Sequence, residues 1–171
     1  MVNIREMVDD DLHVALALNN ASLPDLNELD LPEIGRLARI SAVSLVAEVD
    51  GAFAGFCMVM PPGVEYASLN YGWFSRAYDH FVYLDRIAVH PDYRRFGIGR
   101  SFYTWLIEQF GEHYPVLLCE VNVRPRNDKS LAFHHSIGFR EVGQQDTDGG
   151  KKTVSLLELP LGGARSGTAT A

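Results

Sequence analysis

Apolar residues recur along this chain with two different spacings, one typical of strands and the other typical of helices. Short apolar runs bounded by turn residues predict strands at residues 2–5, 44–49, 53–60, 81–89, 116–123, 139–145 and 152–159. Helix-start signals and helical spacing predict one helix that ends near residue 20, one that follows Pro32, and two at about residues 97–112 and 128–137. The predicted order is β-α-α-β-β-β-α-β-α-β-β, which places the chain in the α/β (α+β) class.

Turn signals join neighbouring strands in this pattern. Asp50-Gly51 separates the runs 44–49 and 53–60 and predicts an antiparallel hairpin, and residues 148–150 join the last two strands. Residues 61–78 are predicted instead to form a long aromatic loop that includes Tyr71 and Trp73. This loop either lines a pocket for an amine or, as we favour, packs on its own domain or forms a contact in a homodimer.

Length and composition predict one globular domain. The 171 residues are enough for a single hydrophobic core, and 47% hydrophobic with 22% charged residues is ordinary for such a chain. We expect the domain to cover residues 1–161 and the small, polar residues 162–171 to form a disordered tail. No apolar run approaches the ~18 residues of a membrane span and the N-terminus does not resemble a signal peptide, so we expect a cytoplasmic protein without a membrane partner.

Charge and cysteine usage argue against several classes of function. The formal net charge is −7 and basic residues cluster only at 94–100, which argues against a nucleic-acid partner. Cys57 and Cys119 lie inside apolar runs and are expected to be buried thiols, not members of a disulfide or a zinc site. No pair of histidines has the spacing of metal ligands, so no metal is expected.

One short segment combines positive charge, permissive backbone and a helix start. Arg94-Arg95-Phe96-Gly97-Ile98-Gly99-Arg100 follows the strand at 81–89 and opens the helix at 97–112. Its glycines let the main chain approach an anion closely, and the N–H groups and dipole of a helix start attract one. The spacing matches neither the nucleoside-triphosphate loop nor the dinucleotide fingerprint. The segment therefore predicts a site for a different ligand that carries a pyrophosphate.

This segment and a second motif resemble those of the GNAT N-acetyltransferase superfamily. The first motif, Arg-x-x-Gly-x-Gly, runs here from Arg94 to Gly99 and in that family holds the pyrophosphate of acetyl-coenzyme A (acetyl-CoA). The second is a strand, an Asn and an aromatic-rich helix ending in Gly-Phe, which are here residues 117–122, Asn127 and residues 132–139. The resemblance covers about residues 2–160.

The resemblance implies a mixed, mostly antiparallel central sheet flanked by helices, with a splayed pair of strands at its centre. It also implies that acetyl-CoA is the cosubstrate and that its pantetheine arm pairs with the end of the strand at 81–89. Core packing would explain that strand end equally well, and helix capping would explain the polar residues at the start of the last helix. The residues implied to hold the cofactor are Ile87, Ala88, Val89, Arg94, Arg95, Phe96, Gly97, Ile98, Gly99, Arg100, Asn127 and Ser130.

Three residues are candidates for acid–base chemistry. Glu120 ends an apolar run, where partial desolvation favours a role as general base, and it matches a glutamate that N-terminal-amine acetyltransferases of the superfamily carry on the same strand. Asp85 is the competing base, although we favour a salt bridge to Arg86 or Arg124. His134 stands where the family usually has a tyrosine that protonates the coenzyme A sulfur, and it either takes that role or packs in the helix.

The sequence therefore predicts an N-acetyltransferase that passes the acetyl group of acetyl-CoA directly to a primary amine in a ternary complex. The acceptor is open between a small molecule and a protein N-terminus. Two other classes stay open: a non-catalytic module that binds or senses acyl-CoA, and a nucleotide-binding interaction protein.

Overall fold

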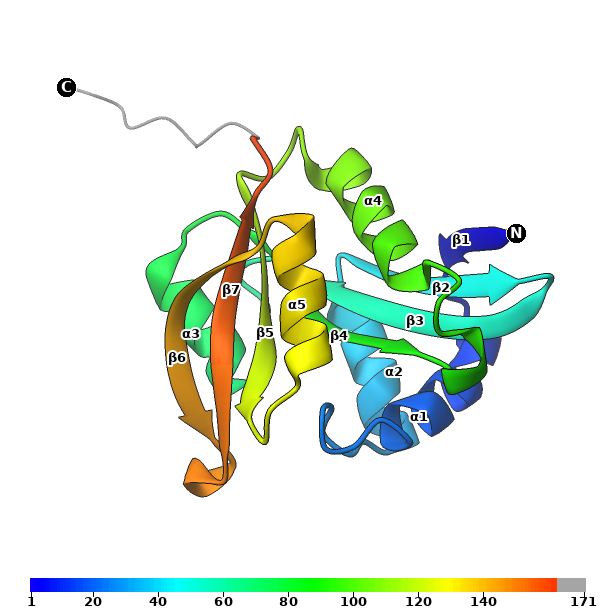
Figure 1. Ribbon diagram of the computed structural model, residues 1–171, viewed down its shortest axis with the longest axis horizontal. Helices are drawn as coiled ribbons and strands as arrows, with labels where there is room; N and C mark the ends of the chain where they lie inside the picture. Colours follow the sequence, from blue (N-terminus) through cyan, green and yellow to red (C-terminus); the bar gives the residue numbers. More distant parts are fainter. Residues whose placement is uncertain (163–171) are drawn as a thin grey trace. The chain divides into compact units, whose positions relative to one another are not determined.

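The computed structural model describes residues 1–162, which form two compact units. The first unit combines Met1–Met60 with Leu84–Leu106, and the second combines Pro61–Tyr83 with the chain from Ile107. In the described residues, seven strands are hydrogen-bonded in the order β1-β2-β3-β4-β5-β7-β6, and five α-helices accompany them (Figure 1). That residues 1–161 act as one domain stays a prediction, and the tail predicted from residue 162 lies almost wholly outside the described residues.

The first unit is built around an antiparallel meander. Val2 pairs with Val49, and Val43 pairs with Val59. The hairpin predicted at Asp50-Gly51 is confirmed, and both turn residues have positive φ, as this kind of turn requires. The elements of the unit are β1 (Val2–Glu6), α1 (Leu12–Asn20), α2 (Leu31–Ile40), β2 (Val43–Val49), β3 (Ala52–Met60), most of β4 (Val82–Val89) and the start of α4 (Ile98–Phe110).

Helices α1 and α2 lie on one side of β3, and the start of α4 lies on the other (Figure 1). Helix α2 begins at a polar cap: the side chain of Asp30 accepts a hydrogen bond from the N–H of Glu33 at 2.9 Å. Ile34 and Leu37 then face the core and are fully buried. Strand β3 is therefore covered on both faces, as its unbroken run of apolar residues indicates.

Strands β3 and β4 approach closely at Gly55. A Cβ atom at this glycine would lie 2.7 Å from the carbonyl oxygen of Ala88, which is backbone and cannot rotate away. Next to this contact, the N–H of His90, the residue that follows β4, donates to the carbonyl of Ala54 at 2.9 Å. The absence of a side chain at Gly55 is thus what lets β4 lie at this distance from β3.

The second unit is a second set of strands with a helix on each face. The parallel pair β4 and β5 joins Val82 to Leu117 and Tyr83 to Leu118, at the first residues of β4. Helices α3 and α5 lie on opposite faces of the antiparallel strands (Figure 1). The elements of the unit are α3 (Leu69–Ala77), the start of β4, the end of α4, β5 (Val116–Arg124), α5 (Asp128–Ile137), β6 (Arg140–Thr147) and β7 (Lys152–Pro160).

The predicted aromatic loop at 61–78 is wrong for residues 69–77, which form α3. Ser68 caps this helix by accepting a hydrogen bond from the N–H of Tyr71 at 3.2 Å. Tyr71 and Phe74, one helical turn apart, are buried, and Trp73 packs over Gly143 of β6. The aromatic residues therefore pack on their own unit, which is the alternative that the sequence analysis favoured.

We predict that Gly55→Ala lowers the free energy of unfolding by about 1–3 kcal/mol, because the new methyl group forces the backbone of β4 away from β3. Gly35→Ala is the matched control. Gly35 lies inside α2 with ordinary contact distances around an added Cβ, so the same change there should stabilise the chain by about 0.5–1 kcal/mol. Urea unfolding measures both variants, and a Gly55→Ala chain as stable as the Gly35→Ala chain would contradict the prediction.

Candidate functional site

The predicted anion-binding segment connects β4 to α4. A short 3-10 helix, Pro91–Tyr93, follows β4, and the chain then passes through Arg95 and Gly97 with φ of 77° and 76°. The carbonyl of Gly97 accepts the N–H of Ser101 at 2.9 Å, so Gly97 stands at the cap of α4. N–H groups in the first turn of a helix have no acceptor within that helix and point outward along its axis. The segment therefore offers backbone donors to an anion.

The surface of this segment is open and basic. Arg94, Arg95 and Arg100 are exposed, and Phe96 is 54% exposed. A Cβ at Gly97 would meet no atom within 4 Å, so the space in front of the helix start is not filled by the chain itself. Three guanidinium groups around a helix N-terminus suit a doubly charged pyrophosphate. The residues present thus fit the phosphate part of acetyl-CoA.

Strand β4 leads into this segment and has two different faces. Leu84, Arg86 and Ala88 alternate with Asp85, Ile87 and Val89, so the two sets of side chains lie on opposite faces of the strand. Tyr83 belongs to that second face by the same alternation. The residues proposed for the pantetheine arm, Ile87–Val89, are the last three of β4, and the short 3-10 helix Pro91–Tyr93 separates them from the basic segment.

Glu120 lies in β5, and a tyrosine holds its carboxylate. The hydroxyl of Tyr83 lies 2.8 and 2.7 Å from the two carboxylate oxygens and donates its hydrogen to them. Tyr83 is fully buried, and its ring lies 5.7 Å from that of Tyr71 and 5.6 Å from that of Phe74. The aromatic cluster fixes the phenol, and the phenol in turn fixes a half-buried carboxylate.

Tyr83 was not singled out from the sequence. The contact between Tyr83 and Glu120 follows from the register of β4 against β5. Tyr83 pairs with Leu118, and Leu118 and Glu120 share one face of β5. A tyrosine at the start of one strand and a glutamate on another become neighbours only when the offset between the strands is known. The sequence of either strand alone does not determine the register of a parallel pair.

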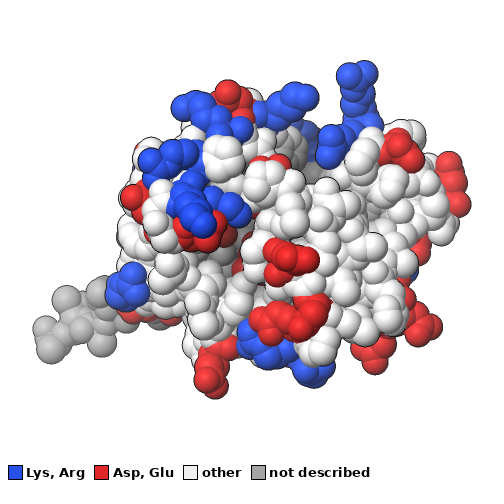
Figure 2. Space-filling view, turned by 90° about the horizontal axis from the view of Figure 1, so that it is seen from below, with Lys and Arg blue, Asp and Glu red and all other residues white. Residues whose placement is uncertain are grey.

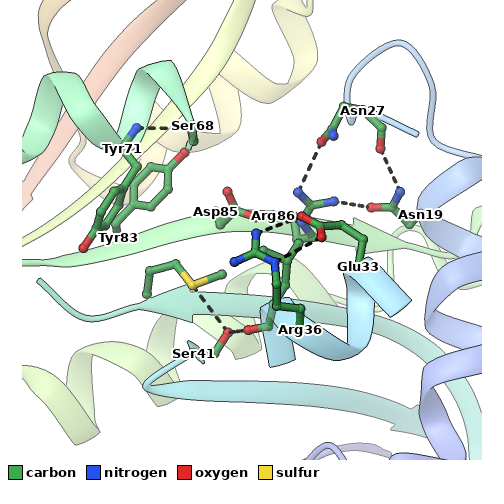
Figure 3. Close-up of polar contacts among 12 residues, drawn as sticks. Asn19, Asn27, Glu33, Arg36, Ser41, Ser68, Tyr71, Tyr83, Asp85 and Arg86 are labelled. Atoms are coloured by element: carbon green, nitrogen blue, oxygen red, sulfur yellow. Dashed lines mark hydrogen bonds and ion pairs between the residues drawn. The ribbon is translucent and has the colours of Figure 1, made fainter. Parts of the chain in front are cut away.

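Asp85 has a different partner. Its carboxylate accepts a hydrogen bond from Nε of Arg86 at 2.7 Å, and the two side chains are 4% and 3% exposed. Arg86 also donates to the side-chain oxygens of Asn19 at 2.8 Å and Asn27 at 3.2 Å (Figure 3). A buried carboxylate beside a buried guanidinium balances its charge. Asp85 therefore makes the salt bridge to Arg86 that the sequence analysis favoured.

His134 is buried in α5 and is only 3% exposed. Its Nδ1 lies 2.7 Å from the carbonyl oxygen of Ser130, so the hydrogen of the neutral ring sits on Nδ1. Burial lowers the pKa of His134 below its usual 6.5, although the bond to Ser130 opposes this shift. The favoured state is thus a neutral imidazole in which Nε2 is a hydrogen-bond acceptor.

Asn127 and Ser130 organise the start of α5. The side chain of Asn127 accepts a hydrogen bond from the N–H of Ser130 at 3.1 Å and so caps the helix. Ser130 then provides the carbonyl that orients His134. Both residues therefore have a local structural role, with which a contact to the cofactor is compatible.

Charged side chains of both signs lie interspersed on the face shown in Figure 2, with uncharged surface between them.

Within residues 1–162, no group of three or more His, Cys, Asp or Glu side chains is placed to hold a metal ion. None of the helices that the structure describes is both long enough and apolar enough to cross a membrane.

Sequence comparison identifies relatives of this chain. The model of the acetyltransferase (GNAT) family matches residues 12–139. The ribosomal protein bS18-alanine N-acetyltransferase of Escherichia coli strain K12 is 33% identical over 82 residues, which are 46% of this chain and 55% of that protein. The L-methionine sulfoximine/L-methionine sulfone acetyltransferase of Salmonella typhimurium is 29% identical over 145 residues, which are 82% and 74% of the two chains. The chain thus spans about half the length of the first relative.

Solved structures share the fold. The ribosomal-protein-S18-alanine N-acetyltransferase from Escherichia coli aligns with a TM-score of 0.73 and 20% identity, over 100% of this chain and 99% of that one. A Salmonella typhimurium protein solved with its cofactor acetyl-CoA aligns with a TM-score of 0.69 and 20% identity, over 99% of both chains. The mixed, mostly antiparallel fold implied by the sequence is therefore confirmed. Because the family model covers residues 12–139 and the fold is shared along the chain, this protein belongs to the GNAT family of acetyltransferases.

Proposed function

We propose that this protein is an N-acetyltransferase that passes the acetyl group of acetyl-CoA to a primary amine by direct attack in a ternary complex. The observation that carries the proposal is the open, arginine-rich helix start at residues 94–100 in a chain of this family. The relatives named above add support, because one is named for an alanine of a ribosomal protein and the other for an amino-acid derivative. Both of these acceptors present an amine, and we assign this chain to the same reaction class.

In this proposal the basic segment binds the cosubstrate. Backbone N–H groups at the start of α4 and the side chains of Arg94, Arg95 and Arg100 contact the pyrophosphate, with Phe96, Ile98 and the glycines shaping the segment. Ile87, Ala88 and Val89 hold the pantetheine arm along β4, and Asn127 and Ser130 contact it from α5. Bound acetyl-CoA supplies a thioester that is already activated for transfer, so the chain has to orient it and prepare the amine.

Glu120 is the proposed general base. An amine is a nucleophile only after its ammonium form loses a proton, and a half-buried carboxylate can take that proton directly or through water. Tyr83 positions the carboxylate by donating to it. Asp85, the second candidate, is occupied by Arg86, and we therefore assign it to charge balance in place of catalysis.

His134 is proposed to lie near the sulfur as an acceptor, not as an acid. A neutral ring with its hydrogen on Nδ1 cannot donate from Nε2, but it can accept the hydrogen of a thiol. A thiol has a pKa of ~8.5, so the departing thiolate is stable enough to leave without a strong acid. In this respect the chain differs from family members in which tyrosine is thought to donate the proton.

We predict that Gly97→Glu abolishes binding of acetyl-CoA, which the unchanged chain should bind with a Kd on the order of micromolar, or about −8 kcal/mol. The new side chain brings bulk and negative charge into the space in front of α4. Calorimetric titration measures the affinity.

Gly51→Glu controls for the strain of this change. Gly51 has φ of 81° against 76° for Gly97, and an added Cβ likewise meets nothing within 4 Å, so the backbone cost of the substitution is matched. Equal loss of affinity in both variants, or no binding by the folded parent chain, would remove the assignment of the cofactor site.

We predict that Glu120→Gln lowers kcat by about 100-fold or more, because the amide cannot accept the proton, while the Kd of acetyl-CoA stays unchanged. Tyr83→Phe should lower kcat by about 10-fold, since it removes only the donor that holds the carboxylate. The double variant should be no slower than Glu120→Gln, because Tyr83 acts through Glu120.

Steady-state rates with a panel of amines measure these effects. The panel includes a peptide with a free N-terminal alanine and L-methionine sulfone, following the names of the two relatives. Unchanged turnover in Glu120→Gln would show that the base is another group. Tight binding of acetyl-CoA without turnover of any amine by the parent chain would favour the non-catalytic module.

We predict that kcat does not fall between about pH 6.5 and 8. Burial lowers the pKa of His134 below 6.5, so the neutral ring already predominates at pH 6.5 and its share only grows toward pH 8. A reaction that needed the protonated ring would lose rate as the pH rises. His134→Gln should keep the shape of the profile, as should the exposed neighbour variant His135→Gln. A basic limb near neutral pH that disappears only in His134→Gln would assign the acid role to His134.

A further inference from the structure

His90 stands at the turn between strand β4 and the basic segment, and its backbone is held from two sides. Its N–H donates to the carbonyl of Ala54 in β3 at 2.9 Å, and its own carbonyl accepts from the N–H of Tyr93 at 3.0 Å. His90 has φ of −58° and ψ of 135°, which suits a residue that both caps a helix and precedes a proline. The backbone of His90 therefore closes β4 and opens the 3-10 helix Pro91–Tyr93.

The imidazole of His90 caps this 3-10 helix. Its Nδ1 lies 3.3 Å from the backbone nitrogen of Asp92 and accepts the hydrogen of that N–H. An imidazole nitrogen accepts a hydrogen bond only while it carries no hydrogen, so the ring in this arrangement is neutral, with its hydrogen on Nε2. The oxygens of Ser, Thr and Asn caps accept at every pH, whereas a histidine loses this acceptor when it is protonated. The cap that His90 provides is therefore conditional on pH.

The same turn offers the protonated ring a different partner. Oδ2 of Asp92 lies 3.8 Å from Nδ1 of His90, and the two side chains are 83% and 45% exposed. Once Nδ1 carries a hydrogen it faces the N–H of Asp92 as a second donor, and the carboxylate of the same residue attracts the charged ring. Neutral and protonated His90 therefore favour different contacts with Asp92, the first to its backbone and the second to its side chain.

The ring of His90 is the group of this turn that changes its charge near neutral pH. The charged neighbours along the chain are Asp92, Arg94 and Arg95, and carboxylates and guanidinium groups ordinarily keep their charge between pH 5.5 and 8. Within residues 1–162, the ring makes no hydrogen bond or ion pair other than the two with Asp92.

The elements next to the turn bring no second group of this kind to the ring in the described part of the chain. Strand β3, which accepts the N–H of His90, presents Ala54 and Gly55 there. The start of α4 packs Ile98 against Gly55, with Cγ2 of Ile98 at 3.5 Å from a Cβ at that glycine, and the first charged residue of α4 is Arg100. A pH effect on this turn is therefore assigned to His90.

The backbone bonds that follow the capped helix are long. The N–H of Arg94 donates to the carbonyl of Pro91 at 3.3 Å, and the N–H of Phe96 donates to the carbonyl of Tyr93 at 3.4 Å. The ring of Tyr93 lies 5.8 Å from that of His90 and 6.0 Å from that of Phe96. Bonds of this length are weak. The path of residues 91–96 therefore depends on how its first turn is capped.

We propose that His90 is a positioning residue for acetyl-CoA, which binds more tightly when this ring is neutral than when it is protonated. The inference rests on the proposed binding of acetyl-CoA at residues 94–100. The neutral ring caps the turn that presents the backbone donors and arginines, whereas protonation releases the cap and leaves a less ordered turn that binding must order again. The new positive charge offsets this loss only weakly, because it is exposed and lies beside Asp92.

Two substitutions separate the cap from the ring. His90→Asn provides a cap whose oxygen accepts at every pH, and His90→Ala provides none, while both remove the ring contact with Tyr93. His13→Asn is the matched control, because His13 is exposed on α1 of the same unit. Circular dichroism confirms that each chain is folded at pH 5.5 and 8, and calorimetric titration then measures the Kd of acetyl-CoA.

Between pH 8 and 5.5 we expect the Kd of the parent chain to rise about fivefold relative to that of His90→Asn, the effect of losing one N-cap bond. Histidine ordinarily titrates near ~6.5, inside this window. The 3′-phosphate of acetyl-CoA also titrates there, near ~6, and dividing by the Kd of His90→Asn removes its contribution. His90→Ala should bind about fivefold more weakly than His90→Asn at both pH values, and His13→Asn should follow the parent.

Nitrogen NMR of the histidine rings reports the state of His90 directly. Its hydrogen should lie on Nε2 at pH 8, and both ring nitrogens should carry hydrogen at pH 5.5. Saturating acetyl-CoA should move this titration to lower pH, because a ligand that prefers the neutral ring favours loss of the proton by the same factor. A polyanion that senses only the charge of the ring would move the titration to higher pH instead.

Two results would overturn the inference. One is an equal pH dependence of Kd in the parent chain and in His90→Asn, which would show that the ring does not act on the ligand. The other is a titration of His90 that moves to higher pH when acetyl-CoA binds. If the parent chain binds no acetyl-CoA at any pH, the proposed function fails and the role of His90 in binding fails with it, whereas NMR of the free chain still reports whether Nδ1 accepts from Asp92.

Discussion

Close backbone contact between β3 and β4 at Gly55 is the constraint on which the candidate site depends. Because no side chain separates Gly55 from the carbonyl of Ala88, β4 lies directly against a strand that is covered on both faces. The strand is thereby fixed just before the chain turns into the basic segment and α4. The same strand carries Arg86, whose burial beneath the segment between α1 and α2 requires that β4 stay in this place. A single missing methyl group thus sets the position of the basic segment and of the buried ion pair between Asp85 and Arg86.

The carboxylates with little exposure to solvent have different kinds of hydrogen-bond partner. Asp85 pairs with Arg86, and Glu158 pairs with Arg140 while it also accepts from Tyr78, whose pKa is raised by burial and by this carboxylate. These are ion pairs that neutralise charge within the fold. Glu120 instead accepts from the phenol of Tyr83, a neutral donor that orients a carboxylate without cancelling its charge. The ion pair with Arg86 is the physical reason for not choosing Asp85 as the base.

Short-range patterns in the sequence predicted most of the fold. Alternation and turn residues placed the strands within a few residues, and the Asp50-Gly51 hairpin was specific because few residues adopt its backbone angles. Helix α3 was missed because its aromatic residues suggested a binding loop, although the Ser68 cap and the turn-spaced Tyr71 and Phe74 favoured a helix. Partnerships such as Tyr83 with Glu120 could not be predicted, because they join residues from different strands, and strand register is set by packing.

Trp73, which packs over Gly143 in the second unit, has a counterpart in the first unit, Trp105 of α4. The chain contains two tryptophans, so each compact unit carries one natural fluorophore. The emission of an indole ring depends on how much water surrounds it, and replacing either ring by phenylalanine would leave a reporter for one unit alone. Tryptophan fluorescence of these variants would thus show whether the two units lose their structure together or in succession.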